Sequence, residues 1–351
     1  MNKIIRFLLT IAVSSALFAC SSTSEVPEGD RLYTGLEPIK YTDYESNEHF
    51  TATQEEIEAA LDCPPNGAIF GSSYYRSPFP YSLWIWNAFH ESESPIGKWV
   101  TKTFGNQPVL MSWVNPALRA SVAQSQLRNH GYFRGTVNYE EKPYSKHPKA
   151  KIAYHVDCGH LFTIDTVTYS NFPLNADSLI AASADEAKIK SGSPFDVVSL
   201  DAERNRLSNL FRNNGYYYYQ PSYASYRADT VNTPGKVKLD VELADNLPEK
   251  ALKKWYIGNI SINLRRTFME ELKDSIHYYF FRAYFNGKKP PVRPRVIMSD
   301  MKLRHGQPYD YSKHTESNNR IASKGMFSSV DFQFTPRDTT AAVSYTHLTL
   351  P

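Results

Sequence analysis

The chain has 351 residues, of which 41% are hydrophobic and 21% charged, so it is long enough for two or three domains with cores of their own. Its formal net charge is only +3, and no basic cluster is longer than a pair or triplet, which argues against a nucleic-acid-binding protein.

The N-terminal end has the pattern of an exported, lipid-anchored protein. Residues 7–18 form an apolar stretch of secretory length behind a positively charged start. They lead into Leu17-Phe-Ala-Cys20, which resembles the lipobox of bacterial lipoproteins, whose cysteine becomes the lipidated first residue. We therefore expect a signal peptide over residues 1–19, acyl chains on Cys20 that anchor the protein, and a tether over residues 20–31. The alternative is a buried N-terminal helix with an incidental cysteine.

Residues 32–159 are expected to form a first α/β module. Thr53 and Asn115 are the expected helix caps, and Leu118, Val122 and Leu127 are candidate core positions of the second helix. The predicted elements are a strand over 32–41, helices over 53–61 and 115–130, and a hairpin over 132–141 and 151–157. Residues 68–104 are rich in Tyr, Phe and Trp, and we interpret them as an insertion that packs on the module itself. A membrane or partner surface is the alternative.

Residues 160–250 and 251–343 are expected to form two further modules, each with the order strand, helix, helix, strand, strand. In the second module, residues 237–243 alternate apolar with polar side chains, as in a strand with one buried face. In the third, residues 265–294 are interpreted as an insertion. Residues 344–351 break the alternation that a closing strand needs, so we expect a truncated third module and a tail that is not native.

One junction occurs three times and organises the chain. Helical sequence runs through a glycine into aromatic residues at Leu127-Arg-Asn-His-Gly-Tyr-Phe133, at Leu210-Phe-Arg-Asn-Asn-Gly-Tyr216 and at Ile321-Ala-Ser-Lys-Gly-Met-Phe327. We expect each helix to end on its glycine in a left-handed conformation, which costs glycine little, and an aromatic strand to follow. A unit that occurs three times predicts three copies of one module.

Together with the lipobox, these modules resemble POTRA (polypeptide-transport-associated) domains, and more narrowly the lipid-anchored, TamL-like branch of the outer-membrane protein assembly superfamily. The resemblance implies an α+β fold of tandem β-α-α-β-β modules, three in number with the last incomplete. Family members continue into a membrane β-barrel, but this chain lacks the succession of alternating segments that a barrel requires, so we expect none in it. The segments that carry the resemblance are Cys20, Val26-Pro-Glu-Gly-Asp-Arg-Leu-Tyr33, Pro65-Asn-Gly-Ala-Ile-Phe-Gly71, Tyr256-Ile-Gly-Asn-Ile-Ser-Ile262, Gly306-Gln-Pro-Tyr309 and its counterpart Gly192-Ser-Pro-Phe195.

The resemblance also implies a function, that of a non-enzymatic arm in the periplasm, anchored in the lipid of the outer membrane by the acylated Cys20. Such an arm would bind unfolded outer-membrane protein clients by strand addition, act with other subunits of an assembly module, and pass the clients to an insertase. By analogy with the family, the binding edge is the strand after the second helix. The expected client-binding residues are Tyr132, Tyr139, Tyr217, Tyr219 and Tyr223.

The sequence offers little other chemistry. It has no phosphate loop, nucleophile elbow or kinase signature, and we expect no cofactor. His155, Cys158 and His160 lie close together but match no metal-binding spacing, so we expect no metal site there. Cys63 and Cys158 could form a disulfide in an oxidising compartment or stay free. A lipid-anchored structural or adhesive spacer is the rival function, and the missing nucleophile motif disfavours a third one, an exported hydrolase.

Overall fold

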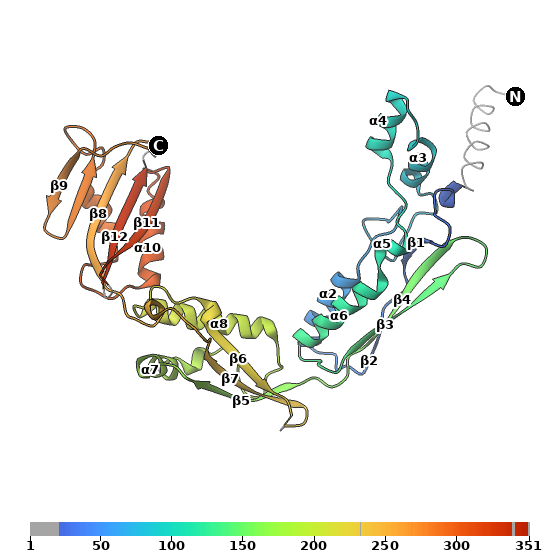
Figure 1. The fold of residues 1–351 in the computed structure, drawn as a ribbon, viewed down its shortest axis with the longest axis horizontal. Coiled ribbons are helices and arrows are strands. Elements are labelled where there is room, and N and C mark those ends of the chain that lie inside the picture. The colour runs from blue at the N-terminus through green and yellow to red at the C-terminus, as the bar shows by residue number, and fades with distance from the viewer. Residues whose placement is uncertain (1–20, 232, 268, 339–340, 350–351) are drawn as a thin grey trace. The chain divides into compact units, whose positions relative to one another are not determined.

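The computed structural model describes residues 21–231, 233–267, 269–338 and 341–349, and it has a mixed α+β fold (Figure 1). Its three sheets have four, three and five strands in chain order, one for each predicted module. The chain divides into two compact units. One contains the residues up to Thr163 together with Pro194–Asp196, and the other contains Ile164–Ser193 and the residues from Val197 onward. No helix of the described ranges is long and apolar enough to span a bilayer.

The sheet of the first module is built around one central strand. Its members are β1 (Leu32–Leu36), β2 (Lys40–Thr42), β3 (Thr136–Pro143) and β4 (Lys149–Asp157). β1 and β2 pair one after the other with one side of β4, both parallel to it, and β3 pairs antiparallel with its other side. The predicted hairpin is therefore present, although β3 begins later than expected, whereas the single strand predicted over 32–41 is divided into β1 and β2, with residues 37–39 between them.

The helices of the first module cover this sheet and extend beyond it (Figure 1). They are η1 (Ser21–Thr23, a 3-10 helix), α2 (Glu48–Leu61), α3 (Tyr81–Phe89), α4 (Pro95–Phe104), α5 (Met111–Val114) and α6 (Pro116–Asn129). α2 begins before the predicted Thr53 because Asn47 caps it, accepting a hydrogen bond from the backbone N–H of Phe50 at 2.8 Å. Asn115 caps α6 as predicted, accepting from the backbone N–H of Leu118 at 3.2 Å.

The predicted buried face of α6 is partly wrong. Leu118 is 59% exposed and Val122 is exposed too, whereas Ala120, Ala123 and Leu127 are buried. α6 packs against α2, and alanines at the contact let the two helix backbones approach closely. The longer side chains therefore lie outside, which a count of apolar residues could not foresee.

The second module follows the predicted order of strand, helix, helix, strand, strand. It contains β5 (Thr163–Ser170), α7 (Leu174–Ala182), η2 (Ala184–Glu186), α8 (Val197–Asn213), η3 (Pro221–Tyr223), β6 (Ala224–Asp229) and β7 (Lys236–Leu243). The strand order is β5-β7-β6. Val237, Leu239 and Val241 of β7 are fully buried while Lys236 and Lys238 are exposed, so the predicted alternation is confirmed.

The third module repeats this topology and adds a hairpin. After η4 (Glu249–Ala251) it contains β8 (Ile257–Arg265), β9 (Asp274–Tyr278), β10 (Phe281–Phe285), α9 (Pro294–Asp300), α10 (Tyr311–Ala322), β11 (Ser329–Asp338) and β12 (Ala341–Thr349). The insertion over 265–294 forms β9 and β10, and β10 extends the sheet by pairing parallel with β8. β12 pairs antiparallel with β11 and parallel with β8, so the expectation that the last hairpin lacks its partner is wrong.

The three helix-ending glycines adopt the predicted conformation. Gly131, Gly215 and Gly325 have φ values of +86°, +101° and +64°. At Gly131 a Cβ atom would lie 2.7 Å from the carbonyl oxygen of Phe195, so close approach of the backbone also favours glycine there. The strand expected directly after each glycine is not present: residues 216–220 form turns and irregular structure, and β6 begins only at Ala224.

Candidate functional site

In every module the strand that follows the second helix of the repeated order lies at an edge of the sheet. β3, β6 and β11 each pair with one neighbour only, namely β4, β7 and β12, within the described part of the chain. Their other sides present backbone N–H and C=O groups along the strand. The strand after the second helix is therefore an edge strand, as the family analogy predicted.

The outer side of each module's first strand is partly occupied by the chain itself, and in the third module β10 also pairs there, so that β9 is the opposite edge of that sheet. In the second module, Ile164 donates to the carbonyl of Ser193 at 2.8 Å and Gly192 donates to the carbonyl of Ile164 at 2.7 Å. In the third module, Ile257 and Gly306 make the equivalent two bonds, each 2.8 Å long, the first of them to the carbonyl of Gln307. The predicted equivalence of Gly192-Ser-Pro-Phe195 and Gly306-Gln-Pro-Tyr309 is confirmed, because both segments pair with the start of the first strand.

In the first module, other segments pair with the outer side of the first strand, β1. Tyr33 of β1 donates to the carbonyl of Val109 at 2.9 Å, and Leu36 donates to the carbonyl of Ser73 at 2.8 Å. An incoming extended chain would therefore find the outer side of β3 open and the outer side of β1 taken.

The open strand β3 is polar, and its two halves differ in charge. Tyr139 is 42% exposed, and only Val137 of this strand is buried. The second half carries Glu140, Glu141 and Lys142 and ends at Pro143, and charges and proline are features that limit pairing at edges. The half over Thr136–Tyr139 is therefore the better candidate for pairing with another chain.

Of the five tyrosines expected to bind clients, only Tyr139 lies on an edge strand. Tyr132 is buried in the core of the first module, directly after the cap of α6. Tyr219 is 3% exposed, with its ring 4.6 Å from that of Phe211, so the expectation that it faces outward is wrong. Tyr217 packs on Tyr309 and Phe334 of the third module, with ring centroids 4.8 and 5.0 Å away. Tyr223 is half-buried in η3.

The tyrosine run after Gly215 thus holds two modules of one unit together. Lys250 lies over the ring of Tyr218 at 4.6 Å, and Trp255 donates its backbone N–H to the carbonyl of Gly215 at 2.8 Å. From the sequence alone, these four consecutive tyrosines fit a junction between modules and an exposed binding face equally well.

Cys63 and Cys158 are both free thiols, so the disulfide considered above is not formed. Burial raises the pKa of the Cys158 thiol to about 12, and the carboxylates of Asp157 and Asp43 act in the same direction. Such a thiol stays protonated at neutral pH and is a poor nucleophile or metal ligand.

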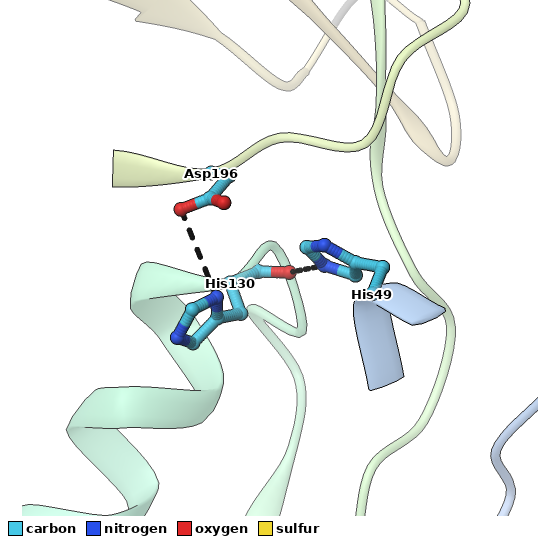
Figure 2. A group of neighbouring side chains, drawn as sticks. All are labelled: His49, His130 and Asp196. Atoms are coloured by element: carbon cyan, nitrogen blue, oxygen red, sulfur yellow. Dashed lines mark hydrogen bonds and ion pairs between the residues drawn. The ribbon is translucent and has the colours of Figure 1, made fainter. Parts of the chain in front are cut away.

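A group of side chains that sequence reasoning missed lies at the end of α6 (Figure 2). His130 follows α6, His49 lies in the first turn of α2, and Asp196 directly precedes α8. The imidazole Nδ1 of His130 is 3.7 Å from a carboxylate oxygen of Asp196, and its Nε2 is 3.1 Å from a carboxylate oxygen of Glu56. Nε2 of His49 is 2.8 Å from the backbone carbonyl of His130. The three residues come from separate segments, so no local spacing could have indicated them.

The aromatic insertion is only partly packed on its own module. Leu83 of α3 is fully buried, and α3 contacts η1. Gly97 of α4 is covered by the side chains of Ser92 and Ser94 just before the helix, while Ile96, Trp99 and Phe104 are 75%, 59% and 53% exposed. The spacing of these three residues places them on one face, so α4 exposes its apolar face to solvent.

Cys20 lies outside the described residues, but the residues that follow it are held by the insertion. Ser22 is buried, and the carboxylate of Glu25 lies 3.4 Å from Nε2 of His90 at the end of α3. The residues that directly follow the predicted anchor therefore contact α3, and α3 in turn contacts α4.

Comparison with known proteins gave structural neighbours only. No protein-family model and no curated protein matches the sequence. POTRA domains 3–5 of BamA from Haemophilus influenzae are 10% identical, with a TM-score of 0.40, and the match covers 93% of this chain and 99% of that one. POTRA domains 1–3 of the periplasmic domain of Omp85 from Anabaena are 11% identical, with a TM-score of 0.29 and coverages of 93% and 97%. The N-terminal domain of Omp85 from Thermosynechococcus elongatus is 14% identical, with a TM-score of 0.26 and coverages of 74% and 94%.

Proposed function

We propose that this chain is the periplasmic arm of an outer-membrane protein assembly or translocation factor, and that it is not an enzyme. In this proposal Cys20 carries the lipid that anchors it in the outer membrane. The arm binds unfolded client chains by strand addition, acts with other subunits of an assembly module, and passes clients to an insertase. The observation that carries the proposal is the open outer side of β3, at one edge of a sheet whose first strand, β1, has its outer side already occupied.

Strand addition suits a protein that handles many clients. Main-chain hydrogen bonds do not depend on the client's side chains, so an open edge accepts different extended sequences. Tyr139, exposed on β3, adds contact area at low cost in conformational entropy. The mixed charges of Glu140, Glu141 and Lys142 limit pairing at the other end of the strand, which favours a short and reversible contact.

The exposed apolar face of α4 supports the proposal that the chain is anchored at the membrane. Helices that lie in the membrane interface carry Trp, Phe and aliphatic residues on one face and lysines on the other. α4 fits this description, because Lys98 and Lys102 lie away from its exposed apolar face. We propose that this face rests on the lipid surface beside the acylated Cys20.

Two neighbouring proline variants test the strand-addition proposal. In an antiparallel pair, successive residues point their N–H groups alternately toward the partner strand and away from it. One of Asn138 and Tyr139 therefore donates outward, and both side chains are exposed. We expect one of Asn138→Pro and Tyr139→Pro to destabilise the first module, and the other to fold normally but lose binding at least about tenfold, since proline removes the N–H that pairs.

The measurement is fluorescence anisotropy with labelled strand peptides from unfolded outer-membrane proteins, with circular dichroism to verify folding. Tyr139→Ala is the matched control and should weaken binding only a few-fold, because it removes side-chain area and leaves the backbone intact. Binding by the folded proline variant that equals binding by wild type would refute pairing at β3. Absence of any peptide binding by the wild type would favour the spacer function instead.

A further inference from the structure

A small groove lies where three segments of the first module meet. It is lined by Ser22 of η1, by residues 76–80 together with Trp84 of α3, and by Lys149 at the start of β4. Its volume is about 230 Å³, below the roughly 300–1,000 Å³ of pockets that hold drug-sized ligands. The groove therefore suits a small chemical group, and in the sequence it lies close to the predicted lipidation site, Cys20.

The backbone at the two cations of this groove is held by main-chain pairing. Ser77 donates its backbone N–H to the carbonyl of Gly67 at 2.8 Å, next to the isolated β-bridge that Arg76 forms. Lys149 lies opposite Leu32 in the pairing of β1 with β4. The backbone at both positions is therefore ordered before any ligand binds, which lowers the entropic cost of binding.

Arg76 and Lys149 are half-buried neighbours of the same charge. Burial lowers the pKa of Lys149, and the Arg76 guanidinium lowers it further. Burial also lowers the pKa of Arg76. Neither cation forms an ion pair with a carboxylate of the described residues, and none of the described residues that line the groove is acidic. An anion in the groove would offset both the desolvation of these charges and their mutual repulsion.

The groove also has buried hydrogen-bond donors without acceptors. Nε of Arg76 and Nε1 of Trp84 are shielded from solvent, and neither has a hydrogen-bond partner among the described residues. Both groups can only donate. Because an unpaired buried donor is costly, folded proteins keep few of them. The ligand that this groove requires therefore carries negative charge and several acceptor oxygens.

We propose that this groove binds a phosphate group, and that a phospholipid headgroup supplies it. Arginine and lysine are the residues that commonly bind phosphate oxygens. Phe79 and Tyr81 are 53% and 63% exposed, with their rings 6.1 and 5.4 Å from that of Trp84. Aromatic rings, above all those of Trp and Tyr, are enriched at the depth of lipid headgroups. The choice of a lipid rests on the proposed anchoring through Cys20, which would hold the groove at the membrane surface.

The test uses the chain from Ser21 onward, which contains every residue that the structure describes and carries no acyl group. ³¹P NMR follows the binding of two probes, inorganic phosphate and dihexanoyl-phosphatidylglycerol below its micelle concentration. We expect wild type to bind the lipid probe. Arg76→Gln and Lys149→Gln should each weaken that binding at least about tenfold, since each removes a charged donor. Trp84→Phe, which removes a neutral N–H, should weaken it only a few-fold.

Lys40→Gln is the matched control, because Lys40 is an exposed lysine on β2 of the same module. It should bind the lipid probe as wild type does. Thermal melting shows whether each variant folds, and the lipid probe should raise the melting temperature of wild type more than that of Arg76→Gln.

The two probes distinguish the sources of the phosphate group. Binding of inorganic phosphate alone, weakened by Arg76→Gln, would support the site but assign it to free phosphate and overturn the lipid headgroup. The whole proposal is overturned if wild type binds neither probe, or if folded Arg76→Gln and Lys149→Gln bind as wild type does. These outcomes are independent of fatty-acid labelling at Cys20 and of peptide binding at β3, which test the proposed function separately.

Discussion

Burial places His314 in an environment that excludes its charged form. His314 lies on α10 among the rings of Tyr309, Phe332 and Phe334, and its Nδ1 is 3.0 Å from the hydroxyl of Tyr309. Burial lowers its pKa from 6.5 to about 4. The Arg212 guanidinium acts in the same direction, and the carboxylate of Asp331 acts against it. Between these two values the unfolded chain binds a proton that the folded chain does not, so this group's stabilising effect is full above pH 6.5 and is lost as the pH falls toward 4.

We therefore expect His314→Phe to reduce the acid sensitivity of the third module. Phenylalanine fits the aromatic surroundings and cannot bind a proton. The free energy of unfolding of wild type should fall by up to about 3 kcal/mol more than that of the variant between pH 7 and 4. Urea unfolding at several pH values measures this, and His277→Gln, at an exposed histidine, is the control. Parallel pH profiles for wild type and His314→Phe would contradict the expectation.

At the scale of helices and strands, the sequence predicted what depends on local chemistry. Gly131 and Gly215 end their helices in the left-handed region, and the apolar residues of β7 are buried, because turn geometry and alternation act over a few residues. The prediction failed where the burial of a side chain depends on residues that are not its neighbours along the local pattern. Tyr219 is buried because Phe211 and Tyr223 surround it. Leu118 is exposed because alanines make the contact between α6 and α2.

Helix α4 carries a prediction of its own. If its apolar face rests on lipid, the chain from Ser21 onward, which has no acyl group, should still bind vesicles weakly. Replacing Ile96 and Trp99 with serine should reduce the vesicle partition coefficient at least about tenfold, because burying one such side chain contributes about 1.5–3 kcal/mol. Vesicle co-sedimentation measures the effect. A lipid-induced shift of tryptophan fluorescence that is lost with Trp99 would report on this one of the chain's five tryptophans.

Leu174→Ser is the control for this experiment, because Leu174 is an apolar residue on α7 that is even more exposed than Ile96 and Trp99. Its vesicle binding should equal that of wild type. Sedimentation velocity distinguishes lipid from self-association: a dimer that the serine variant abolishes would assign the face of α4 to a second copy of the chain. Vesicle binding that the double substitution leaves unchanged would also contradict the lipid contact.

At the scale of the whole molecule, the number and order of modules could be predicted because the same helix–glycine–aromatic junction occurs three times in the sequence. The histidine cluster could not, since residues 49, 130 and 196 belong to three segments that only the folded first unit brings together. The β9–β10 hairpin was likewise foreseen only as an insertion, because an aromatic stretch does not indicate which sheet it will extend.

The last prediction concerns the anchor, on which the membrane contact of the whole chain depends. Leu17-Phe-Ala-Cys20 supplies the only cysteine in a lipobox-like setting, whereas Cys63 and Cys158 lie in the folded module. We expect Cys20→Ala to abolish incorporation of labelled fatty acid and to leave the protein unprocessed or soluble. Cys63→Ser, the matched control, should be labelled as wild type is. Several acyl chains bind a membrane far more strongly than the exposed face of α4 can, so α4 alone should not retain the variant in the membrane fraction. Unchanged labelling and fractionation of Cys20→Ala would refute the lipid anchor, while peptide binding at β3 would still separate an assembly arm from a spacer.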